Sequence, residues 1–324
     1  MKTVLAYSGG LDTSTCIRWI QDKYRSEVIT LTVDVGQNED LKLIEERSKS
    51  LGALKHYSID AKDEFIRKYV FPAIKANALY EGVYPLSSAL SRPLIASKLV
   101  EVARREGASA VAHGCTGKGN DQVRFEVTIH SLDPTLEIIA PVREWSLTRD
   151  EEIKYLKETG IEVGVGHGGI YSIDQNLWGR SIEGGVLEHP EVEPPEDIYE
   201  WTVPIDETPN EPEYLKIEFS GGVPTHINGE KMEPVDLIQE LNAKAGKHGI
   251  GRIDHLEDRL VGIKSREVYE CPAATVILNA HKDLEKSVLT ARELTFKSLV
   301  DGEWSRLVYS GLWMEPLRED LEDF

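Results

Sequence analysis

Strand and helix signals alternate over the first 159 residues, and this alternation limits the fold more than any other feature of the chain. Apolar, β-branched runs predict strands at 2–7, 27–35, 55–59, 108–113 and 137–140. Apolar residues at helical spacing predict helices at 13–23, 39–51, 62–80, 86–106, 121–132 and 149–159, with a kink at Pro93. Repeated strand–helix–strand units place their strands in parallel. We therefore expect an α/β fold with a doubly wound parallel sheet.

The alternation stops near residue 160, and a length of 324 residues suits two domains of roughly 150 residues each. We place the boundary so that the first domain covers 1–165 and an α+β second domain covers 166–324. The segment 188–213 holds ten acidic residues, six prolines and no Lys or Arg. It cannot bury much apolar area, so we expect an extended acidic connection or a surface arm there. A hairpin at 214–227 leading into Asn228-Gly229, and a helix at 235–245, are expected after it.

Charge and cysteine content exclude several classes of protein. The formal net charge is −19, from 37 Lys and Arg against 56 Asp and Glu, and a surface this acidic repels nucleic-acid backbone. Cys16, Cys115 and Cys271 lie far apart without zinc spacing, which indicates a reducing compartment. The chain has no membrane-length apolar run and no signal-peptide pattern. We therefore expect a cytoplasmic protein that binds neither nucleic acid nor membrane.

A glycine-rich loop, Ser8 to Ser14 (SGGLDTS), connects the first expected strand to the first expected helix. Two glycines let the backbone turn sharply, and successive N–H groups at a helix N-terminus form an anion site to which the hydroxyls can add donors. The loop lacks the GK[ST] ending of a Walker A motif, and Asp12 would repel a phosphate unless a cation such as Mg²⁺ lay between them. The alternative is a tight turn capped by Asp12.

A second glycine-rich stretch, 112–126 (AHGCTGKGNDQVRFE), also follows an expected strand and opens a helix. Loops at the carboxyl ends of parallel strands meet at the ligand crevice of an α/β sheet. Lys118 and Arg124 suit a carboxylate, and Asp121 suits an ammonium group, so the stretch fits a zwitterion. The alternative is a capped helix with solvated charges.

Three weaker signals do not indicate a further site. The stretch 164–169 (GVGHGG) fits GxGxxG but lacks the helix and strand that a dinucleotide site needs. The nine His residues show no metal spacing, and His113 suits either a place near a nucleotide or a packed structural position. Trp145 and Trp178 are expected in the core or in subunit contacts.

The loop SGGLDTS resembles the pyrophosphate-binding loop of the ATP-pyrophosphatase superfamily. Together with longer blocks, the chain resembles the argininosuccinate synthase family from about residue 2 to residue 313. These blocks are EGVYPLSSALSRPLIA, GCTGKGNDQVRFE, APVREW, YSIDQNLWGRSIEGGVLE, HGIGRIDHLEDRLVGIKSR and VYECP. The resemblance implies a nucleotide-binding domain followed by a synthetase and oligomerisation domain, in a homotetramer.

The resemblance also implies an activity. Such an enzyme is an ATP-dependent ligase that condenses L-citrulline with L-aspartate to argininosuccinate in arginine biosynthesis, using ATP and Mg²⁺. Citrulline is first adenylated, pyrophosphate leaves, and aspartate then displaces AMP from the citrullyl-adenylate.

Site residues follow from the same resemblance. ATP binding is expected at Ala6, Tyr7, Ser8, Gly9, Gly10, Leu11, Asp12, Thr13, Ser14, Val33 and Gly114. Aspartate binding is expected at Thr116, Asn120 and Asp121, and citrulline binding at Tyr84, Asn120, Arg124, Ser172, Ser181, Glu257 and Tyr269. Asp12 and Lys118 are catalytic candidates, and Asp12 would contact a metal only through Mg-ATP.

Several positions depart from the family pattern. Ala89 stands where many relatives offer citrulline a hydroxyl, which leaves Ser88 as a possible substitute. The stretch 166–169 is rich in glycine, and Cys271, Ala273 and Ala274 replace the Thr and glycines that are common there. The chain ends at Phe324, where relatives continue into a C-terminal arm, so we expect a dimer or a tetramer that weakens on dilution.

Two other functions fit the first loop. A tRNA-modifying thiolase or lysidine-type enzyme would need a basic RNA surface and often a cysteine pair. The net charge of −19 argues against the first requirement, and the lack of a CxxC pair argues against the second. A non-catalytic adenine-nucleotide sensor would need the first domain alone and would have no use for the residue set of the second half.

Overall fold

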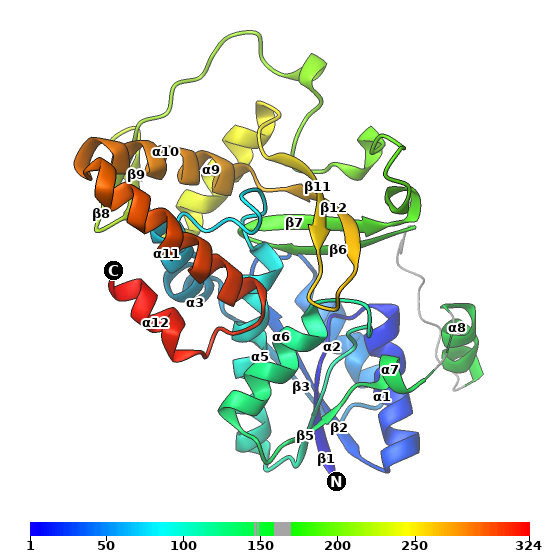
Figure 1. The fold of residues 1–324 in the computed structure, drawn as a ribbon. Helices are drawn as coiled ribbons and strands as arrows, with labels where there is room; N and C mark the ends of the chain where they lie inside the picture. Colours follow the sequence, from blue (N-terminus) through cyan, green and yellow to red (C-terminus); the bar gives the residue numbers. More distant parts are fainter. Residues whose placement is uncertain (146, 148, 159–169) are drawn as a thin grey trace. The chain divides into compact units, whose positions relative to one another are not determined.

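The computed structural model describes residues 1–145, 147, 149–158 and 170–324 (Figure 1). The chain forms two compact units, which we describe separately. Unit 1 contains 1–34, 38–61 and 92–168, and unit 2 contains 35–37, 62–91 and 169–324, within the limits of the described residues. The domain boundary expected near residue 165, and the GVGHGG stretch, lie outside the described residues.

Unit 1 is built on a parallel sheet, which in the described residues has five strands in the order β3-β2-β1-β4-β5. The strands are β1 (Lys2–Ala6), β2 (Glu27–Asp34), β3 (Lys55–Asp60), β4 (Ala110–Ala112) and β5 (Glu137–Ile139). The helices are α1 (Leu11–Tyr24), α2 (Leu41–Ser50), α5 (Ser87–Glu106), α6 (Asp121–Leu132), α7 (Pro141–Glu144) and α8 (Arg149–Glu158). Helix α1 lies on one side of the sheet and α5 and α6 on the other (Figure 1), which confirms the doubly wound α/β fold.

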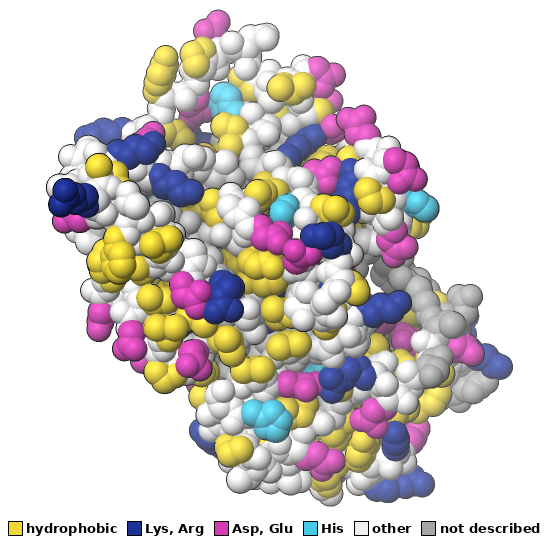
Figure 2. Space-filling view, viewed as in Figure 1, with side chains coloured by type: hydrophobic (Ala, Val, Ile, Leu, Met, Phe, Trp, Pro, Cys, Tyr) yellow, Lys and Arg dark blue, Asp and Glu magenta, His cyan; other side chains and the backbone are white. Residues whose placement is uncertain are grey.

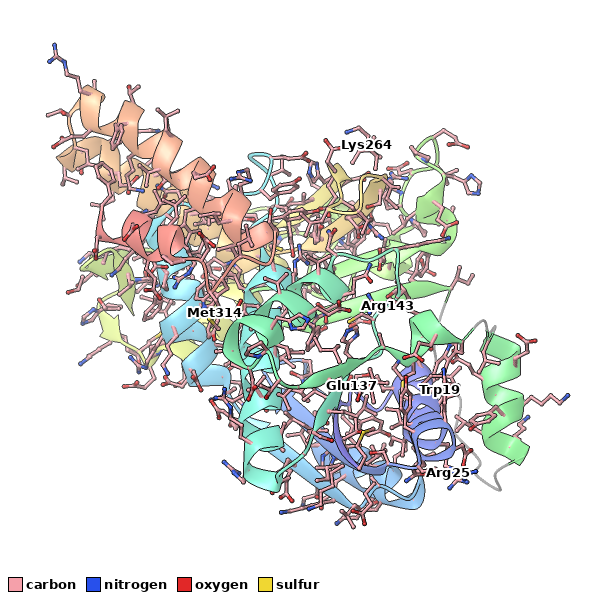
Figure 3. The ribbon with its side chains drawn as sticks, turned by 60° about the horizontal axis from the view of Figure 1, so that its bottom comes forward. Trp19, Arg25, Glu137, Arg143, Lys264 and Met314 are labelled. Carbon is pink, nitrogen blue, oxygen red and sulfur yellow. The ribbon has the colours of Figure 1, made fainter. Side chains whose placement is uncertain are left out.

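The core of unit 1 explains why its strands were visible in the sequence. Strand β2 is buried from Val28 to Val33, because helices cover both faces of the sheet. On the α1 face, Leu5 and Val28 pack with Cys16, Ile17 and Ile20. Trp145 is partly buried against the core and packs edge-on against Trp19 of α1, with ring centroids 5.6 Å apart. Trp19 is labelled in Figure 3. In unit 2, Trp178 is fully buried and donates to Pro85 O.

The long helix expected at 62–80 is shorter and irregular. It consists of α3 (Lys62–Phe65), a π-helical turn η1 (Ile66–Val70) and α4 (Phe71–Lys75). Pro72 has no N–H to donate to a carbonyl of the preceding turn, so a change of register just before it is physically reasonable. Asn77 then adopts a left-handed φ of 41°, which ends the helix before Tyr80. By contrast, α5 continues through Pro93 as one helix.

Unit 2 contains two antiparallel sheets among its described residues, ordered β11-β12-β7-β6 and β10-β9-β8. The strands are β6 (Tyr171–Asn176), β7 (Gly179–Gly184), β8 (Ile217–Ser220), β9 (Val223–Ile227), β10 (Glu230–Lys231), β11 (Arg252–Asp258) and β12 (Lys264–Glu270). Its further helices are α9 (Pro234–Lys247), α10 (Pro272–Val288), α11 (Ala291–Tyr309) and α12 (Pro316–Asp323), with short 3₁₀ turns η2 (Gly185–Glu188), η3 (Glu196–Ile198) and η4 (Ile205–Glu207). The expected hairpin turns at Gly221-Gly222, and Asn228-Gly229 makes the next turn, into β10.

The acidic segment 188–213 is anchored to the protein rather than merely extended. Glu270 is fully buried at the end of β12, and its carboxylate accepts the backbone N–H groups of Glu200, Trp201 and Thr202 at 2.9–3.0 Å. Arg180 Nη1 donates to the same carboxylate at 2.9 Å. Most of the segment is exposed, in line with the expectation that it buries little apolar area, and Ile198 is an exception. What the sequence did not suggest is that a carboxylate 68–70 residues away pairs with the backbone at 200–202.

Charged side chains of both signs are interspersed with apolar ones on the face shown in Figure 2. Across residues 1–145, 147, 149–158 and 170–324, no helix is both long and apolar enough to cross a bilayer.

Candidate active site

In unit 1, the two glycine-rich loops leave the sheet from adjacent strands. Strand β1 pairs with β2 on one side and with β4 on the other, and Leu5 lies opposite Ala112 in the register. This is the point where the strand order reverses, and ligands of open α/β sheets bind outside the carboxyl ends of such strands. A Cβ on Gly114 would lie 2.9 Å from Thr13 Cγ2, so the loops approach closely and a side chain at this position would require Thr13 to shift.

The first loop presents backbone amides and hydroxyl groups. Gly9 has a φ of 78°, a conformation that favours glycine, and Gly10 is the N-cap of α1. No described side chain caps this helix, so the turn capped by Asp12 that we considered above is not formed. Ser8 Oγ and Thr13 Oγ1 lie 3.1 Å apart at the surface, and Asp12 is exposed. The arrangement leaves the N-terminal end of α1 to a ligand.

Three contacts, two of them buried, hold this loop in place. Tyr7 OH and Ser14 Oγ are 3.1 Å apart, and Thr32 Oγ1 donates to Tyr7 O at 2.6 Å. Burial raises the pKa of Tyr7, so this phenol stays neutral. Arg47 of α2 donates to Gly9 O, a contact that the sequence did not suggest. Val33 is buried near the end of β2, the strand next to β1.

The second loop ends in a charge cluster at the start of α6, in which Arg124 is buried and Asp121 is partly exposed. Arg92 Nε donates to Asp121 Oδ2 at 2.7 Å, and Arg124 Nη1 donates to Asp121 Oδ1 at 2.9 Å. Burial alone would raise the pKa of Asp121, but the two guanidinium groups outweigh it and lower this pKa to about 2. The Arg124 side chain is only 4% exposed. The solvated-charge alternative therefore does not describe Arg124, whereas Lys118 is exposed and Asp121 is partly exposed.

The other expected residues of the second loop differ in exposure. Asn120 is buried at the N-cap of α6, and Gly114 is half-buried. Thr116 and Lys118 are exposed. The charged side chains at the start of α6 are thus held in place by ion pairs, whereas Thr116 and Lys118 are open to solvent and ligands.

In unit 2, the β-register places four expected citrulline-binding residues on one face of a sheet. Tyr269 of β12 lies opposite Ser181 of β7, and Ser172 of β6 lies opposite Glu183, two residues further along β7. Glu257 of β11 lies opposite Ser265, four residues before Tyr269. Residues two or four apart on a strand share a face. One face of the sheet therefore carries Ser172, Ser181, Glu257 and Tyr269, together with Asp174, Glu183, His255 and Glu267.

Glu257 is the centre of a hydrogen-bonded aromatic cluster on that face. It is buried, and its two carboxylate oxygens accept the hydroxyls of Tyr269 and Tyr309, each at 2.6 Å. Tyr84 stacks on Tyr269 with ring centroids 4.2 Å apart. Burial is the main cause that raises the pKa of Tyr269, so this phenol remains a neutral donor. Tyr309 of α11 was not expected from the sequence.

The substitution at Ala89 is partly explained by its neighbour. Ala89 is buried, and Ser88 Oγ donates to Asp174 Oδ2 at 2.7 Å. Asp174 O in turn accepts from Ser181 Oγ at 3.4 Å. Ser88 thus places a hydroxyl next to the strand that carries Ser172 and Asp174. The replacement of Thr by Cys271 gives a fully buried thiol, whose pKa burial raises.

The expected residues thus fall into two groups. The ATP and aspartate residues, with Arg124, belong to unit 1. The remaining citrulline residues Tyr84, Ser172, Ser181, Glu257 and Tyr269 belong to unit 2. Within each unit the structure brings them onto neighbouring loops or onto one sheet face. Arg47, Arg92, Asp174 and Tyr309 join these groups without a local sequence signal.

Two family models cover the described parts of the chain almost completely. The arginosuccinate synthase N-terminal HUP domain matches residues 2–162, and the arginosuccinate synthase C-terminal domain matches residues 171–324. The chain belongs to the argininosuccinate synthase family. Members of this family are ATP-dependent ligases that condense citrulline with aspartate in arginine biosynthesis.

Similar curated proteins carry the same family name. An argininosuccinate synthase of Pyrococcus furiosus is 62% identical over 324 residues, which are 100% of this chain and 78% of that protein. One from Methanocaldococcus jannaschii is 60% identical over 99% of this chain and 81% of that protein, and one from Bacillus cytotoxicus is 57% identical over 100% and 80%. A solved structure titled as a predicted subunit of a tRNA methyltransferase from Methanocaldococcus jannaschii matches 49% of this chain and 75% of that chain. Its TM-score is 0.32 and its identity 18%, too low to carry any argument.

The sheet face of unit 2 that carries Glu183, Glu257 and Glu267 gives a first testable prediction, which concerns pH. Glu267 is buried beside Glu183, and burial together with this neighbour raises its pKa to about 8, although Arg259 donates to it. The folded chain therefore binds a proton at Glu267 more tightly than the unfolded chain does. Stability should fall as the pH rises from the ordinary glutamate pKa of 4.5 towards 8.

Glu267→Gln removes the charge and keeps the shape. We expect the variant to gain melting temperature relative to the parent at pH 9, with a smaller difference at pH 5. Thermal unfolding across this range measures the effect, and Glu230→Gln, at an exposed carboxylate of β10, is the matched control. A difference that does not depend on pH would mean that Glu267 is charged throughout.

Proposed function

We propose that this chain binds ATP, L-citrulline and L-aspartate and forms argininosuccinate, AMP and pyrophosphate through a citrullyl-adenylate. The family match over both halves of the chain is the observation that carries the proposal. A nucleotide sensor would not need the residue set of unit 2. A tRNA-modifying enzyme would need a basic surface, whereas the net charge is −19.

The first loop of unit 1 is the proposed site for the phosphates of ATP. Its support is the uncapped N-terminus of α1, the left-handed Gly9 and the exposed hydroxyls of Ser8 and Thr13. Backbone amides at a helix N-terminus favour negative charge, so they would stabilise the departing pyrophosphate without a Walker lysine. Lys118, exposed on the second loop, is a candidate for adding charge there.

Mg²⁺ fits this site as a companion of the nucleotide. In the described part of the chain, no cluster of three or more His, Cys, Asp or Glu residues could hold a metal ion. Mg²⁺ commonly binds through one or two carboxylates together with substrate phosphates and water. Asp12, exposed in the first turn of α1, would be such a carboxylate. The ion would neutralise charge on the pyrophosphate.

The two amino acids would be held by charge and hydrogen bonds. Arg124 suits a carboxylate of citrulline, and the loop residues Thr116, Asn120 and Asp121 suit aspartate. Glu257 suits the ammonium group of citrulline, because a carboxylate has about four acceptor positions and the two tyrosines use two of them. Ser172 and Ser181 supply hydroxyls on the same sheet face.

The chemistry explains why adenylation must come first. Nitrogen lone pairs delocalise into the ureido carbonyl, so its carbon is a poor electrophile and its oxygen a poor leaving group. Attack of that oxygen on the α-phosphorus forms a P–O bond and breaks the bond to pyrophosphate. The aspartate amine then attacks the activated carbon, loses a proton, and displaces AMP, which carries the former ureido oxygen.

A product assay tests this function. With ATP, citrulline and aspartate, the purified protein should release AMP and pyrophosphate in equal amounts. With citrulline alone, it should exchange labelled pyrophosphate into ATP. Stoichiometric ADP, or pyrophosphate release that does not depend on citrulline, would contradict the proposal. The expected homo-oligomer, the Mg²⁺ requirement and the cytoplasmic location stay predictions.

A further inference from the structure

Four side chains in unit 1 connect α7 to the second glycine-rich loop. They are His113, at the start of the stretch 112–126, Gln122 and Glu126 of α6, and Arg143 of α7 (labelled in Figure 3). None of them belongs to the residues expected to bind ATP, aspartate or citrulline. Gln122 and Glu126 are four residues apart and therefore lie on one face of α6.

Arg143 contacts both α6 residues with separate nitrogens. Its Nη2 forms an ion pair with Glu126 Oε1, and its Nη1 donates to Gln122 Oε1 at 2.8 Å. The nearby His113, which is the larger cause, and the charge of Arg143 together hold the pKa of Glu126 below its ordinary value. A planar guanidinium can make two such contacts at fixed geometry, whereas an ammonium group cannot.

Gln122 and Glu126, the two residues that Arg143 contacts, are each linked to a different part of the loop backbone. Gln122 Nε2 donates to Gly117 O at 2.6 Å, next to Thr116. On the other branch, His113 Nε2 lies 3.4 Å from Glu126 Oε1, and His113 Nδ1 accepts the N–H of Cys115 at 3.2 Å, next to Gly114. Because Nδ1 accepts, the ring proton is on Nε2, the nitrogen that lies close to the Glu126 carboxylate.

We propose that Arg143 is a positioning residue that holds the second loop at two points. The Gln122 branch fixes the part that carries Thr116, and the Glu126–His113 branch fixes the part that carries Gly114. This inference rests on the proposed function, in which Thr116 serves aspartate and Gly114 serves ATP. Loss of one branch should therefore weaken the binding of one substrate, whereas loss of the Arg143 side chain should weaken the binding of both ATP and aspartate.

Substitutions at Arg143 separate the two branches, and its side chain is 35% exposed, so the variants should fold. Arg143→Met removes both contacts and should raise the KM for ATP and the KM for aspartate about tenfold each. Arg143→Lys keeps one charge for Glu126 and loses the contact to Gln122. It should raise the KM for aspartate about tenfold and leave the KM for ATP within about twofold.

Two further variants complete the set. Gln122→Met has a similar volume and should reproduce the aspartate defect of Arg143→Lys, with no additional loss in the double variant. The control is Glu144→Gln, next to Arg143, where the carboxylate contacts Lys23 and Tyr24 instead. It should leave both KM values unchanged.

The inference is overturned if Arg143→Met leaves both KM values unchanged, or if Arg143→Lys raises both equally. Amide hydrogen exchange of residues 113–120 separates this failure from failure of the proposed function. Faster exchange near Gly117 in Gln122→Met supports the anchoring even if the parent protein shows no citrulline-dependent turnover. Unchanged exchange in that variant and in Arg143→Met contradicts the anchoring.

Discussion

Arg124→Ala should lower kcat/KM for citrulline by roughly thirty-fold to several-thousand-fold, which corresponds to about 2–5 kcal/mol. The guanidinium lies at the start of α6 in a side chain that is only 4% exposed, so a carboxylate that binds it is shielded from water. The substitution also removes one of the two cations that pair with Asp121. We therefore expect some loss of melting temperature, with Arg92 retaining the other contact.

Arg104→Ala is the matched control for Arg124. Arg104 also lies in unit 1 and pairs with an aspartate, Asp133, at 3.0 Å, but its side chain is 55% exposed. Steady-state kinetics with citrulline varied should show a large effect for Arg124→Ala and almost none for Arg104→Ala. Unchanged citrulline kinetics in a folded Arg124→Ala protein would mean that the Arg124–Asp121 pair is structural only.

Glu270→Gln should destabilise the protein by about 3–5 kcal/mol, because it removes the buried charged partner of Arg180 and leaves only the exposed carboxylate of Glu200 to pair with this guanidinium. The side chains of Glu270 and Arg180 are both at most 2% exposed. The amide can accept some of the backbone N–H bonds that the carboxylate accepts now, but it carries no charge. The segment that contains Ile198 and Thr202 should become the first site of proteolysis.

Denaturant unfolding and limited proteolysis measure this effect. Glu196→Gln is the control, since Glu196 pairs with Arg252 at 2.8 Å in the same segment but is 62% exposed. An exposed pair contributes at most about 1 kcal/mol. Equal, small losses in the two variants would contradict a central role for the buried pair.

The sequence predicted the bounds of helices and strands best where an element is buried along its whole length. Strand β2 and helix α6 lie close to their expected bounds, because a strand covered on both faces and a helix with a fixed apolar side leave a local periodic pattern. The prediction of one continuous helix at 62–80 was wrong, because apolar periodicity alone does not account for Pro72 or for the left-handed backbone at Asn77. Local periodicity therefore located elements well and their interruptions poorly.

The candidate site was predictable only where its residues stand in a local motif. The two glycine-rich loops were visible because glycines and hydroxyls follow strands directly. Tyr309 donates to Glu257 from a distance of 52 residues along the chain, and Arg92 reaches Asp121 across 29. Likewise, only the strand register shows that Ser172 and Tyr269 share a sheet face. Such pairings depend on tertiary packing, which a local pattern does not contain.

Transfer of an oxygen atom tests the adenylation route most directly. Citrulline labelled with ¹⁸O at the ureido position should be incubated with ATP, aspartate and the purified protein, and the products analysed by mass spectrometry. Attack of the ureido oxygen on the α-phosphorus predicts one labelled oxygen in AMP and none in pyrophosphate. AMP without the label would show that water or another group attacked the α-phosphate, and would contradict the citrullyl-adenylate mechanism.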